Sequence, residues 1–320
     1  MIHVFIDGQE GTTGLAIEAL LASRPDVSLL RIDAALRKDP AARKALLNQA
    51  DVAVLCLPDK AAQEAVSMVE NPDVHILDAS TAHRTLDGWA YGFPELSAKH
   101  RRAIASGRRI AVPGCHATGF VAAVYPLVAA GLLPKDAPLT CHSITGYSGG
   151  GKTMIAAYGD ASRPTAYDSP RQYALGLSHK HLPEMTHTTG LRSPPVFNPI
   201  VCDFFAGMAV SVPLQMRLLS KPMTRMGLLD HLRSHYEGQR FVTVWDTPTD
   251  GFLPANLVTG TNELRLFVNG NDEMVTLVSV LDNLGKGAAG AAMQNLNIAK
   301  GLPEDTGFAA GGFWERKCEL

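Results

Sequence analysis

The stretch Ile2-His3-Val4-Phe5-Ile6-Asp7-Gly8-Gln9-Glu10-Gly11-Thr12-Thr13-Gly14 decides the fold of the first part of the chain. Its apolar beginning is typical of a short strand, and a helical pattern of apolar residues follows its end. Gly8 would permit a tight turn, Gly11 would let the backbone approach a pyrophosphate, and Gly14 would let the helix pack closely on the strand. Strand, glycine-rich turn and helix thus occur in the order that a dinucleotide site requires.

A simpler interpretation is a plain glycine turn in which Thr12 or Thr13 caps the helix. The G-x-x-G-x-x-G spacing differs from the usual G-x-G-x-x-G, so the glycines alone are a weak signal. Their place between the first strand and the first helix favours the dinucleotide site.

Strands and helices alternate through the first third of the chain, which predicts a Rossmann-type, doubly wound parallel sheet and an α/β fold. Residues 51–58 predict a buried parallel strand because 52–57 is a continuous apolar run, and residues 74–78 predict another short strand. The carboxyl ends of such strands meet the cofactor. We therefore expect Leu57 and Ser80 to lie near it, and Arg84 to suit an anionic substrate.

A basic cluster follows the second expected strand, residues 27–32. Asp33 stands where an NAD enzyme places the acidic residue that binds the ribose, but Arg31, Arg37 and Lys38 surround it. Cationic side chains suit a 2′-phosphate, which favours NADP as the cofactor. The alternative is a solvated loop.

Cys115 lies in the stretch Pro113-Gly114-Cys115-His116-Ala117-Thr118-Gly119, between a short apolar run and a long one. The pattern predicts a cysteine on a turn at the N-terminus of a buried helix. Backbone N–H groups and the helix dipole there favour a thiolate, and the same N–H groups can hold an oxyanion. The alternative is a buried structural cysteine.

Composition excludes several classes of protein. A chain of 320 residues exceeds the usual size of one domain, so we expect two. A formal net charge of −2 provides no basic field for nucleic acid or an anionic membrane. Five scattered cysteines argue against a disulfide framework and for a reducing compartment, which favours the cytoplasm.

The uncharged segment 117–134 is close to the lower limit of about 17–20 residues for a membrane span. It is rich in alanine and glycine and contains Pro126. We expect a core helix kinked at Pro126 and no membrane span.

The second part of the chain begins with an expected strand at residues 141–147. Ser148-Gly149-Gly150-Gly151-Lys152 then predicts a flexible loop, which would serve either as an anion-binding loop or as a mobile linker. Residues 157–171 are polar and contain proline, which predicts irregular structure.

His179 and His181 lie two residues apart, so on an extended segment they would face the same way. Pro183 prevents a long regular element, and Glu184 could orient a histidine. One hypothesis is general acid–base chemistry beside a thiolate. The other is a zinc site formed by His179, His181 and His187 with either the Cys115–His116 or the Cys141–His142 pair, although no C-x-x-C pattern occurs.

Long β-rich runs from residue 200 to 214 and from 263 to 280 predict an α+β domain with a mixed sheet, one face of which is free for subunit contact. A helix follows with small residues that would let it pack closely on the first domain. We expect a cofactor domain at 1–114 completed by the returning helix 284–300, a catalytic and oligomerisation domain at 115–283, and a tail at 301–320.

The chain resembles the N-acetyl-γ-glutamyl-phosphate reductase family in its shorter form, which is related to aspartate-semialdehyde dehydrogenase. The resemblance covers about residues 1–300. It rests on the glycine turn, the Pro113–Gly119 stretch, Asp78-Ala79-Ser80-Thr81-Ala82-His83-Arg84, Tyr91-Gly92-Phe93-Pro94-Glu95-Leu96, His179-Lys180-His181-Leu182-Pro183-Glu184 and Asn283-Leu284-Gly285-Lys286-Gly287. It implies a cytoplasmic NADP enzyme of arginine biosynthesis that is a homo-oligomer, needs no metal, and acts on an acyl phosphate, a semialdehyde and phosphate.

The resemblance also implies roles for individual residues. Cys115 corresponds to the nucleophile that forms a thioester and His181 to the acid–base residue, with His179 the next candidate. The resemblance lines the substrate site with His179, Tyr173 and Glu184, and the chemistry of the residues themselves adds Ser148, Lys152 and Arg84. The resemblance places Gly11, Thr12, Thr13 and Gly14 at the pyrophosphate and Asn283 at the nicotinamide end. The other cofactor-binding candidates are Gly8, Arg37, Lys38, Leu57, Ser80 and Gly285. Gln9 and Glu10 depart from the family's small residues, and Glu10 beside a pyrophosphate is unfavourable unless it points outward.

Other hypotheses remain open from the sequence. The same chemistry could act on aspartyl phosphate or an aminoadipyl analogue, although histidine follows Cys115 here and no asparagine precedes it. A protein of another class, a nucleotide-binding redox sensor, would use Cys115 alone. Such a sensor would not need His179, His181 and Glu184.

Overall fold

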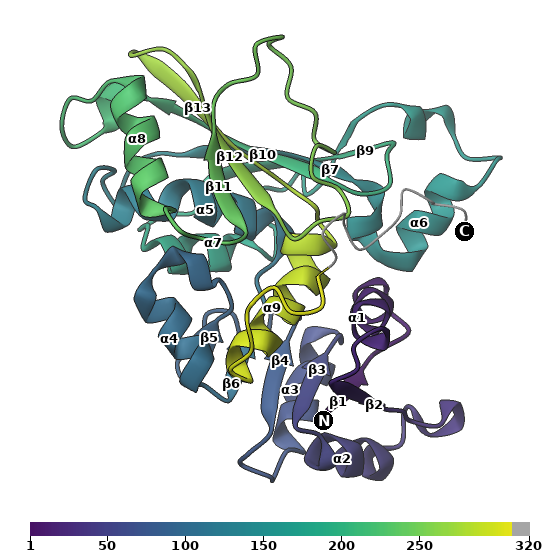
Figure 1. Cartoon of the computed structure of the whole chain (residues 1–320). Coiled ribbons are helices and arrows are strands. Elements are labelled where there is room, and N and C mark those ends of the chain that lie inside the picture. The colour runs from purple at the N-terminus through teal and green to yellow at the C-terminus, as the bar shows by residue number, and fades with distance from the viewer. Residues whose placement is uncertain (309–320) are drawn as a thin grey trace. The chain divides into compact units, whose positions relative to one another are not determined.

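The computed structural model describes residues 1–308, which divide into two compact units (Figure 1). The first comprises residues 1–114 and 288–308, and the second residues 115–287. One unit contains a parallel sheet and the other a mixed sheet, which confirms the expected fold class. The part of the expected tail from 309 to 320 lies outside the described residues.

A six-stranded parallel sheet forms the centre of the first unit. Its order is β2-β1-β3-β4-β6-β5, and every neighbouring pair runs parallel. All side chains of β3 and β4 are buried, as strands covered on both faces require. The strands are β1 (Ile2–Asp7), β2 (Val27–Leu30), β3 (Val52–Leu55), β4 (His75–Asp78), β5 (Ala90–Tyr91) and β6 (Arg109–Ala111).

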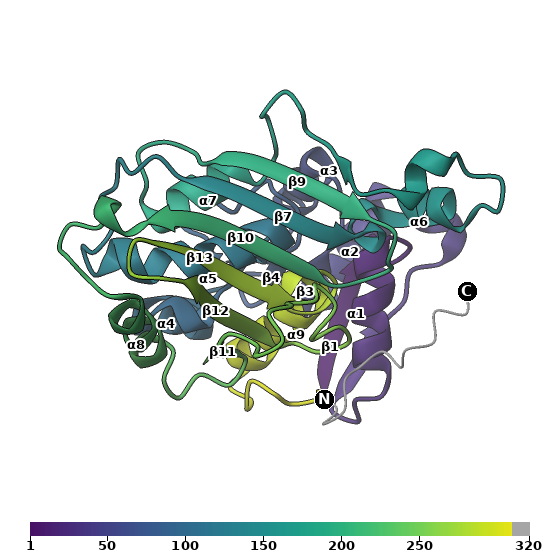
Figure 2. The same cartoon turned by 90° about the horizontal axis from the view of Figure 1, so that it is seen from above.

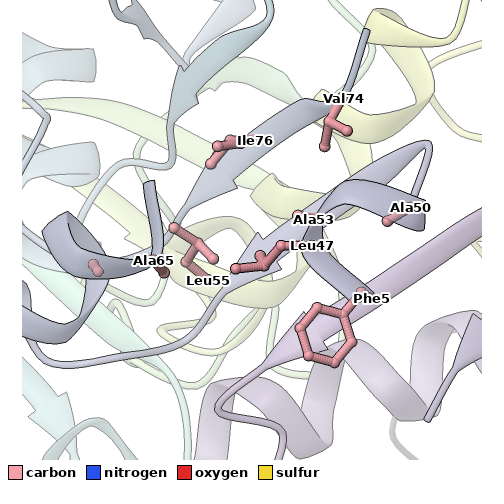
Figure 3. Close-up of a cluster of buried hydrophobic side chains, with 9 residues drawn as sticks. Phe5, Leu47, Ala50, Ala53, Leu55, Ala65, Val74 and Ile76 are labelled. Carbon is pink, nitrogen blue, oxygen red and sulfur yellow. The ribbon is translucent and has the colours of Figure 1, made fainter. Parts of the chain in front are cut away.

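Helices cover both faces of this sheet. Those of the first unit are α1 (Thr12–Ala22), α2 (Pro40–Gln49), α3 (Asp59–Ser67), α4 (Ala98–Ser106) and α9 (Gly290–Ala299), with single 3₁₀ turns at η1 (Ala34–Leu36) and η2 (Pro94–Leu96). Helices α2 and α3 bury Leu47 and Ala65 against Phe5, Leu55 and Ile76 of the strands (Figure 3). Helix α9 contacts α1, α4 and β4.

Helix α9 is the expected returning helix, but it is shorter than residues 284–300. Residues 285–289 form a π-helical turn before it. Its buried polar side chains find partners inside the unit: Gln294 Nε2 donates to Glu95 Oε1 at 2.8 Å, and Arg24 Nη1 donates to Asn297 Oδ1 at 2.6 Å. These bonds satisfy groups that would otherwise be costly to bury.

A seven-stranded mixed sheet forms the second unit, in the order β11-β12-β13-β10-β7-β9-β8. The pairs β11–β12 and β7–β9 are parallel and the others antiparallel. The strands are β7 (Thr140–Gly146), β8 (Arg171–Gln172), β9 (Val196–Cys202), β10 (Met208–Gln215), β11 (Val242–Trp245), β12 (Leu264–Gly270) and β13 (Met274–Leu281).

The inner face of this sheet is covered by α5 (Cys115–Ala129), which packs on β10, β12 and β13. The helix can approach the sheet closely because Gly119 has no side chain: a Cβ there would lie 2.4 Å from Val210 Cγ2. Gly119 O also accepts a 2.7 Å hydrogen bond from Ser279 Oγ. Pro126 lies inside the helix as expected. Helix α7 (Leu182–Thr189) packs on α5, and α8 (Arg225–His235) packs on β11 and β12.

Residues 148–152 do not form the flexible loop that their glycines predict. They belong to a 3₁₀ turn, η3 (Tyr147–Gly150), and to the start of α6 (Gly151–Gly159). The carbonyls of Phe204 and Phe205 accept the N–H groups of Tyr147 and Ser148, so the turn is fixed by neighbouring backbone. Helix α6 also extends into residues 157–171, which were expected to be irregular, and η4 (Thr165–Asp168) and β8 follow it. A further 3₁₀ turn, η5 (Met216–Leu218), follows β10. None of the helices within residues 1–308 combines the length and apolar character needed to span a membrane.

Candidate active site

Cys115 is the first residue of α5 and is partly exposed. The following turns of the helix are buried, so the sulfur lies at the N-terminal end where backbone N–H groups are not used within the helix. Gly287 packs against it: a Cβ on Gly287 would lie 2.6 Å from Cys115 Cβ and 3.2 Å from Cys115 Cα. The π-helical turn at residues 285–289 therefore fixes the backbone and Cβ of Cys115.

His116, the next residue, connects three elements of the second unit. Its Nδ1 lies 2.7 Å from Ser143 Oγ on β7, and its Nε2 lies 2.7 Å from Tyr173 Oη, just after β8. His116 and Ser143 are buried. Because each ring nitrogen has a hydroxyl partner, this network fixes the imidazole plane and the position of the Tyr173 hydroxyl.

Burial keeps this network uncharged. It lowers the pKa of His116 from 6.5 to about 3, with smaller contributions from His179 and Lys180. Burial, and secondarily the nearby Cys115, raises the pKa of Tyr173. The His116 imidazole is therefore neutral and the Tyr173 phenol protonated at physiological pH.

His179 and His181 come together at the start of α7, where His181 is the N-cap residue. Their ring centroids are 4.8 Å apart, and each lies 5.5 Å from the His116 ring. The structure thus brings three imidazoles into one cluster, whereas the sequence named His116 only as a candidate zinc ligand and gave it no catalytic or substrate-binding role. Its position next to Cys115 was the signal that could have identified it.

The protonation of His179 is restricted by the backbone. Its Nδ1 accepts the N–H of His181 at 3.1 Å, so neutral His179 carries its proton on Nε2. Burial and the Lys180 charge lower its pKa to about 4. His179 is therefore a hydrogen-bond donor at neutral pH and a poor base.

The segment between Tyr173 and His179 has a strained backbone. Ala174 and Leu177 have φ angles of 52° and 53°, in the left-handed region that non-glycine residues rarely adopt. Such strain is concentrated at functional sites, where surrounding contacts maintain it.

Asn283 uses its side chain within the second unit. Its Oδ1 accepts the N–H of Gly207 at 2.8 Å, and its Nδ2 donates to Ser148 Oγ at 2.8 Å. Gly285 has a packing reason to be glycine, since a Cβ there would lie 2.1 Å from the carbonyl oxygen of Thr261. These contacts hold together η3 and the turn that packs on Cys115. Of the other predicted substrate residues, Lys152 is exposed on α6 and Glu184 is buried in α7.

In the first unit, the glycine turn fits a pyrophosphate. Gly8 has a φ of +88°, and a Cβ there would lie 2.4 Å from Cys56 O. Gly11 is the N-cap of α1 and no side chain caps the helix, so the threonine-capped turn is not formed. A Cβ on Gly14 would lie 2.6 Å from Gly8 O, which shows that this glycine lets the helix approach the turn itself. The buried Thr12 Oγ1 has no hydrogen-bond partner within residues 1–308, as expected for a hydroxyl that meets a phosphate.

The basic cluster after β2 is arranged around ion pairs. Arg37 Nη1 lies 3.0 Å from Glu10 Oε1, and Arg31 Nη1 lies 2.6 Å from Glu18 Oε1. Asp33 Oδ1 accepts the N–H of Ala35 at 2.8 Å and so caps η1. Lys38 is exposed.

The carboxyl end of β4 carries a buried network. Asp78 accepts bonds from the Ser80 hydroxyl at 2.7 Å and interacts with His83 Nδ1 at 2.6 Å. Arg84 is buried and donates to the carbonyls of Val112 and Ala79, at 2.9 and 3.0 Å. Arg84 therefore ties the end of β4 to the segment that leads to Cys115. Leu57 packs at the edge of the core of this unit.

No group of three or more His, Cys, Asp or Glu side chains within the described residues is arranged to hold a metal ion. The four described cysteines, Cys56, Cys115, Cys141 and Cys202, form no disulfide with one another.

The chain has a parallel-sheet unit followed by a mixed-sheet unit that begins at Cys115, and family models assign both to the semialdehyde dehydrogenases. Residues 3–104 match the family model "Semialdehyde dehydrogenase, NAD binding domain", and residues 115–283 match "Semialdehyde dehydrogenase, dimerisation domain". The fold is similar to that of an aspartate semialdehyde dehydrogenase from Francisella tularensis, with a TM-score of 0.71 and 13% identity over 94% of this chain and 100% of that one.

Two relatives are much closer in sequence. N-acetyl-gamma-glutamyl-phosphate reductase 2 from Nostoc sp. is 48% identical over 316 residues, which cover 95% of this chain and 98% of the relative. N-acetyl-gamma-glutamyl-phosphate reductase 2 from Pseudomonas putida is 46% identical over 306 residues, covering 93% and 96%. The chain therefore belongs to the semialdehyde dehydrogenase family and, within it, to the N-acetyl-γ-glutamyl-phosphate reductases.

Proposed function

We propose that the protein catalyses the NADP-dependent reductive dephosphorylation of N-acetyl-γ-glutamyl phosphate to N-acetylglutamate 5-semialdehyde, in arginine biosynthesis. The observation that carries the chemistry is Cys115 at the N-terminus of α5, packed against Gly287 and followed by His116, whose ring is hydrogen-bonded to Ser143 and Tyr173. The names of its relatives support the substrate.

The first step is attack of the Cys115 thiolate on the acyl-phosphate carbon. The C–S bond forms as the C–O bond to phosphate breaks, and inorganic phosphate leaves with the bonding electrons. A thioester is needed because a carboxylate is a poor hydride acceptor, and covalent catalysis divides one difficult step into two easier ones. The helix N-terminus stabilises both the thiolate and the oxyanion formed during attack.

The second step is reduction of the thioester carbonyl, for which a bound nicotinamide would supply the hydride. His181 then donates a proton to the resulting oxyanion, and collapse of the thiohemiacetal releases the aldehyde and regenerates the thiol. The restriction on His179 supports this assignment, because its Nδ1 lone pair is used by the His181 N–H. His179 donates a hydrogen bond from Nε2 to the same oxygen.

Residues of the first unit would hold the cofactor. The N–H groups at the start of α1 and the Thr12 hydroxyl would bind the pyrophosphate, and Arg37 with Lys38 would bind the 2′-phosphate. Ser80 is engaged with Asp78, so it would shape the site through that network.

A steady-state assay tests this function. The enzyme should reduce NADP⁺ when given N-acetylglutamate semialdehyde and phosphate, and it should discriminate against aspartate semialdehyde and aminoadipate semialdehyde. His181→Asn should lose about 10²–10⁴-fold in kcat, the usual contribution of an acid–base group, while Cys115 remains alkylatable. Full activity in that variant would move the role to His179, and activity only with another semialdehyde would overturn the substrate.

We also propose that the protein is a homo-oligomer that associates through the outer face of the mixed sheet. Figure 2 views β7, β9 and β10 from this face, which α5 does not cover. Ile144 and Val196 are 40% and 50% exposed there, and Ile144 pairs laterally with Ile200 and Ala209. Ile144→Glu should convert the oligomer to a smaller species in analytical ultracentrifugation; an unchanged mass would exclude this face.

We place the enzyme in the cytoplasm, where its thiols would remain reduced. Fractionation of the source cells would test this location, and recovery of the protein outside the cytoplasm would contradict it.

A further inference from the structure

The glycine turn and the basic cluster are linked by one ion pair, Glu10–Arg37. Glu10 belongs to the turn expected to meet the pyrophosphate, and Arg37 follows η1. Arg37 Nη1 and Glu10 Oε1 are 3.0 Å apart, with side chains 38% and 57% exposed. The carboxylate therefore points out of the turn and towards the cation expected to bind the 2′-phosphate.

Local structure explains why Arg37 lies there. Asp33 caps η1 by accepting the Ala35 N–H, and the Leu36 N–H bonds to Asp33 O at 2.9 Å. This tight turn brings the chain from the end of β2 back to the glycine turn. Arg31 is engaged with Glu18 on α1, so Arg37 is the guanidinium held beside the turn.

We propose that Glu10 is a specificity-determining residue that competes with the 2′-phosphate for Arg37 and thereby limits the preference for NADP(H) over NAD(H). This inference rests on the proposed cofactor site. A 2′-phosphate that binds the guanidinium competes with the Glu10 carboxylate for it, and the two anions then lie near each other. NADH has no 2′-phosphate and leaves the pair intact, so Glu10 weakens the binding of NADPH alone.

The size of the effect follows from the exposure of the pair. Exposed ion pairs contribute about 0.2–1 kcal/mol, which corresponds to a change of about 1.4- to 5-fold in a dissociation constant. Removal of the Glu10 charge should therefore tighten NADPH binding by up to about fivefold.

The test is direct binding of NADPH and NADH to the full chain without substrate, by isothermal titration calorimetry. Glu10→Gln should lower the Kd of NADPH by about 1.4- to 5-fold at low ionic strength and leave the Kd of NADH unchanged. Arg37→Gln should raise the Kd of NADPH by about tenfold or more, because charge-assisted hydrogen bonds are lost. In the Arg37→Gln background, Glu10→Gln should tighten NADPH binding less than in the wild type, because the competition for Arg37 is gone and only the repulsion of the 2′-phosphate remains.

Glu70→Gln is the matched control, since Glu70 forms an exposed pair with Lys44 in the same unit. It should change neither Kd. Equal changes for NADPH and NADH in Glu10→Gln, or weaker NADPH binding, would overturn the proposal, because Glu10 would then act on the turn as a whole. Failure of the wild-type chain to bind either nucleotide would instead overturn the proposed cofactor site itself.

Discussion

The contact between Gly287 and Cys115 makes one substitution especially informative. A Cβ placed on Gly287 would lie 2.6 Å from Cys115 Cβ and 3.1 Å from Asp282 O. Carbon atoms in contact are normally about 3.5–4.0 Å apart, so Gly287→Ala must move Cys115 by about 1 Å. A misplacement of about 1 Å costs about a hundredfold in rate, and overpacking of this kind costs about 1–3 kcal/mol of stability.

We therefore expect Gly287→Ala to lower kcat by about a hundredfold while the protein remains folded. Rapid-quench kinetics would measure acylation of Cys115, and iodoacetamide would report the reactivity of its thiol. Gly159→Ala is the control, because a Cβ there meets nothing within 4 Å. Wild-type acylation and alkylation rates in a folded Gly287→Ala protein would refute the idea that this glycine positions the nucleophile.

Three further predictions concern other parts of the molecule. Thr12→Val should raise the Kd of NADPH by about two- to tenfold, because one hydrogen bond to the cofactor is lost, and it should leave the stability in urea denaturation unchanged. An unchanged Kd would show that Thr12 does not bind the cofactor. His116 has its pKa lowered from 6.5 to about 3, so the unfolded chain takes up its proton first as the pH falls. The stability that the neutral imidazole contributes is complete above pH 6.5 and is lost towards pH 3. The unfolding free energy should therefore fall by about 3 kcal/mol less between pH 7 and pH 4 in His116→Gln than in the wild type. Urea denaturation would measure both falls, and equal falls would contradict the burial of a neutral imidazole. Ala174→Gly should raise the unfolding free energy by up to about 1 kcal/mol, because glycine adopts the left-handed backbone without strain, and a loss of stability would argue against that strain.

The fold was largely predictable from the sequence because its signals are local. The apolar run of β3, the short strand β4 and the glycine turn before α1 together predict a parallel sheet. Residues 148–152 were predicted wrongly because glycine content indicates backbone freedom, whereas the carbonyls of Phe204 and Phe205 hold this turn through contacts distant in sequence.

The site was predictable in its residue types and less so in its geometry. Cys115, His179 and His181 could be selected from their motifs, and their roles stay predictions. The sequence does not show that His179 Nδ1 accepts a backbone N–H, or that Ser143 is a partner of His116. Both facts depend on how β7 and α7 pack beside α5.

The contacts of Glu10 show the same limit. The residue is unfavourable beside a pyrophosphate on its own, and only the return of the chain through η1 provides Arg37 as its partner. A long-range ion pair of this kind leaves no periodic signal in the sequence.

The most direct test of the central claim is the detection of a thioester on Cys115. The enzyme would be mixed with N-acetylglutamate semialdehyde and NADP⁺ in the absence of phosphate, quenched in acid and analysed by mass spectrometry of its peptides. We predict an N-acetylglutamyl adduct on the peptide that contains Cys115, its discharge when phosphate is added, and its absence in Cys115→Ala. Turnover of the semialdehyde with phosphate in Cys115→Ala, or an adduct on another residue, would contradict the account.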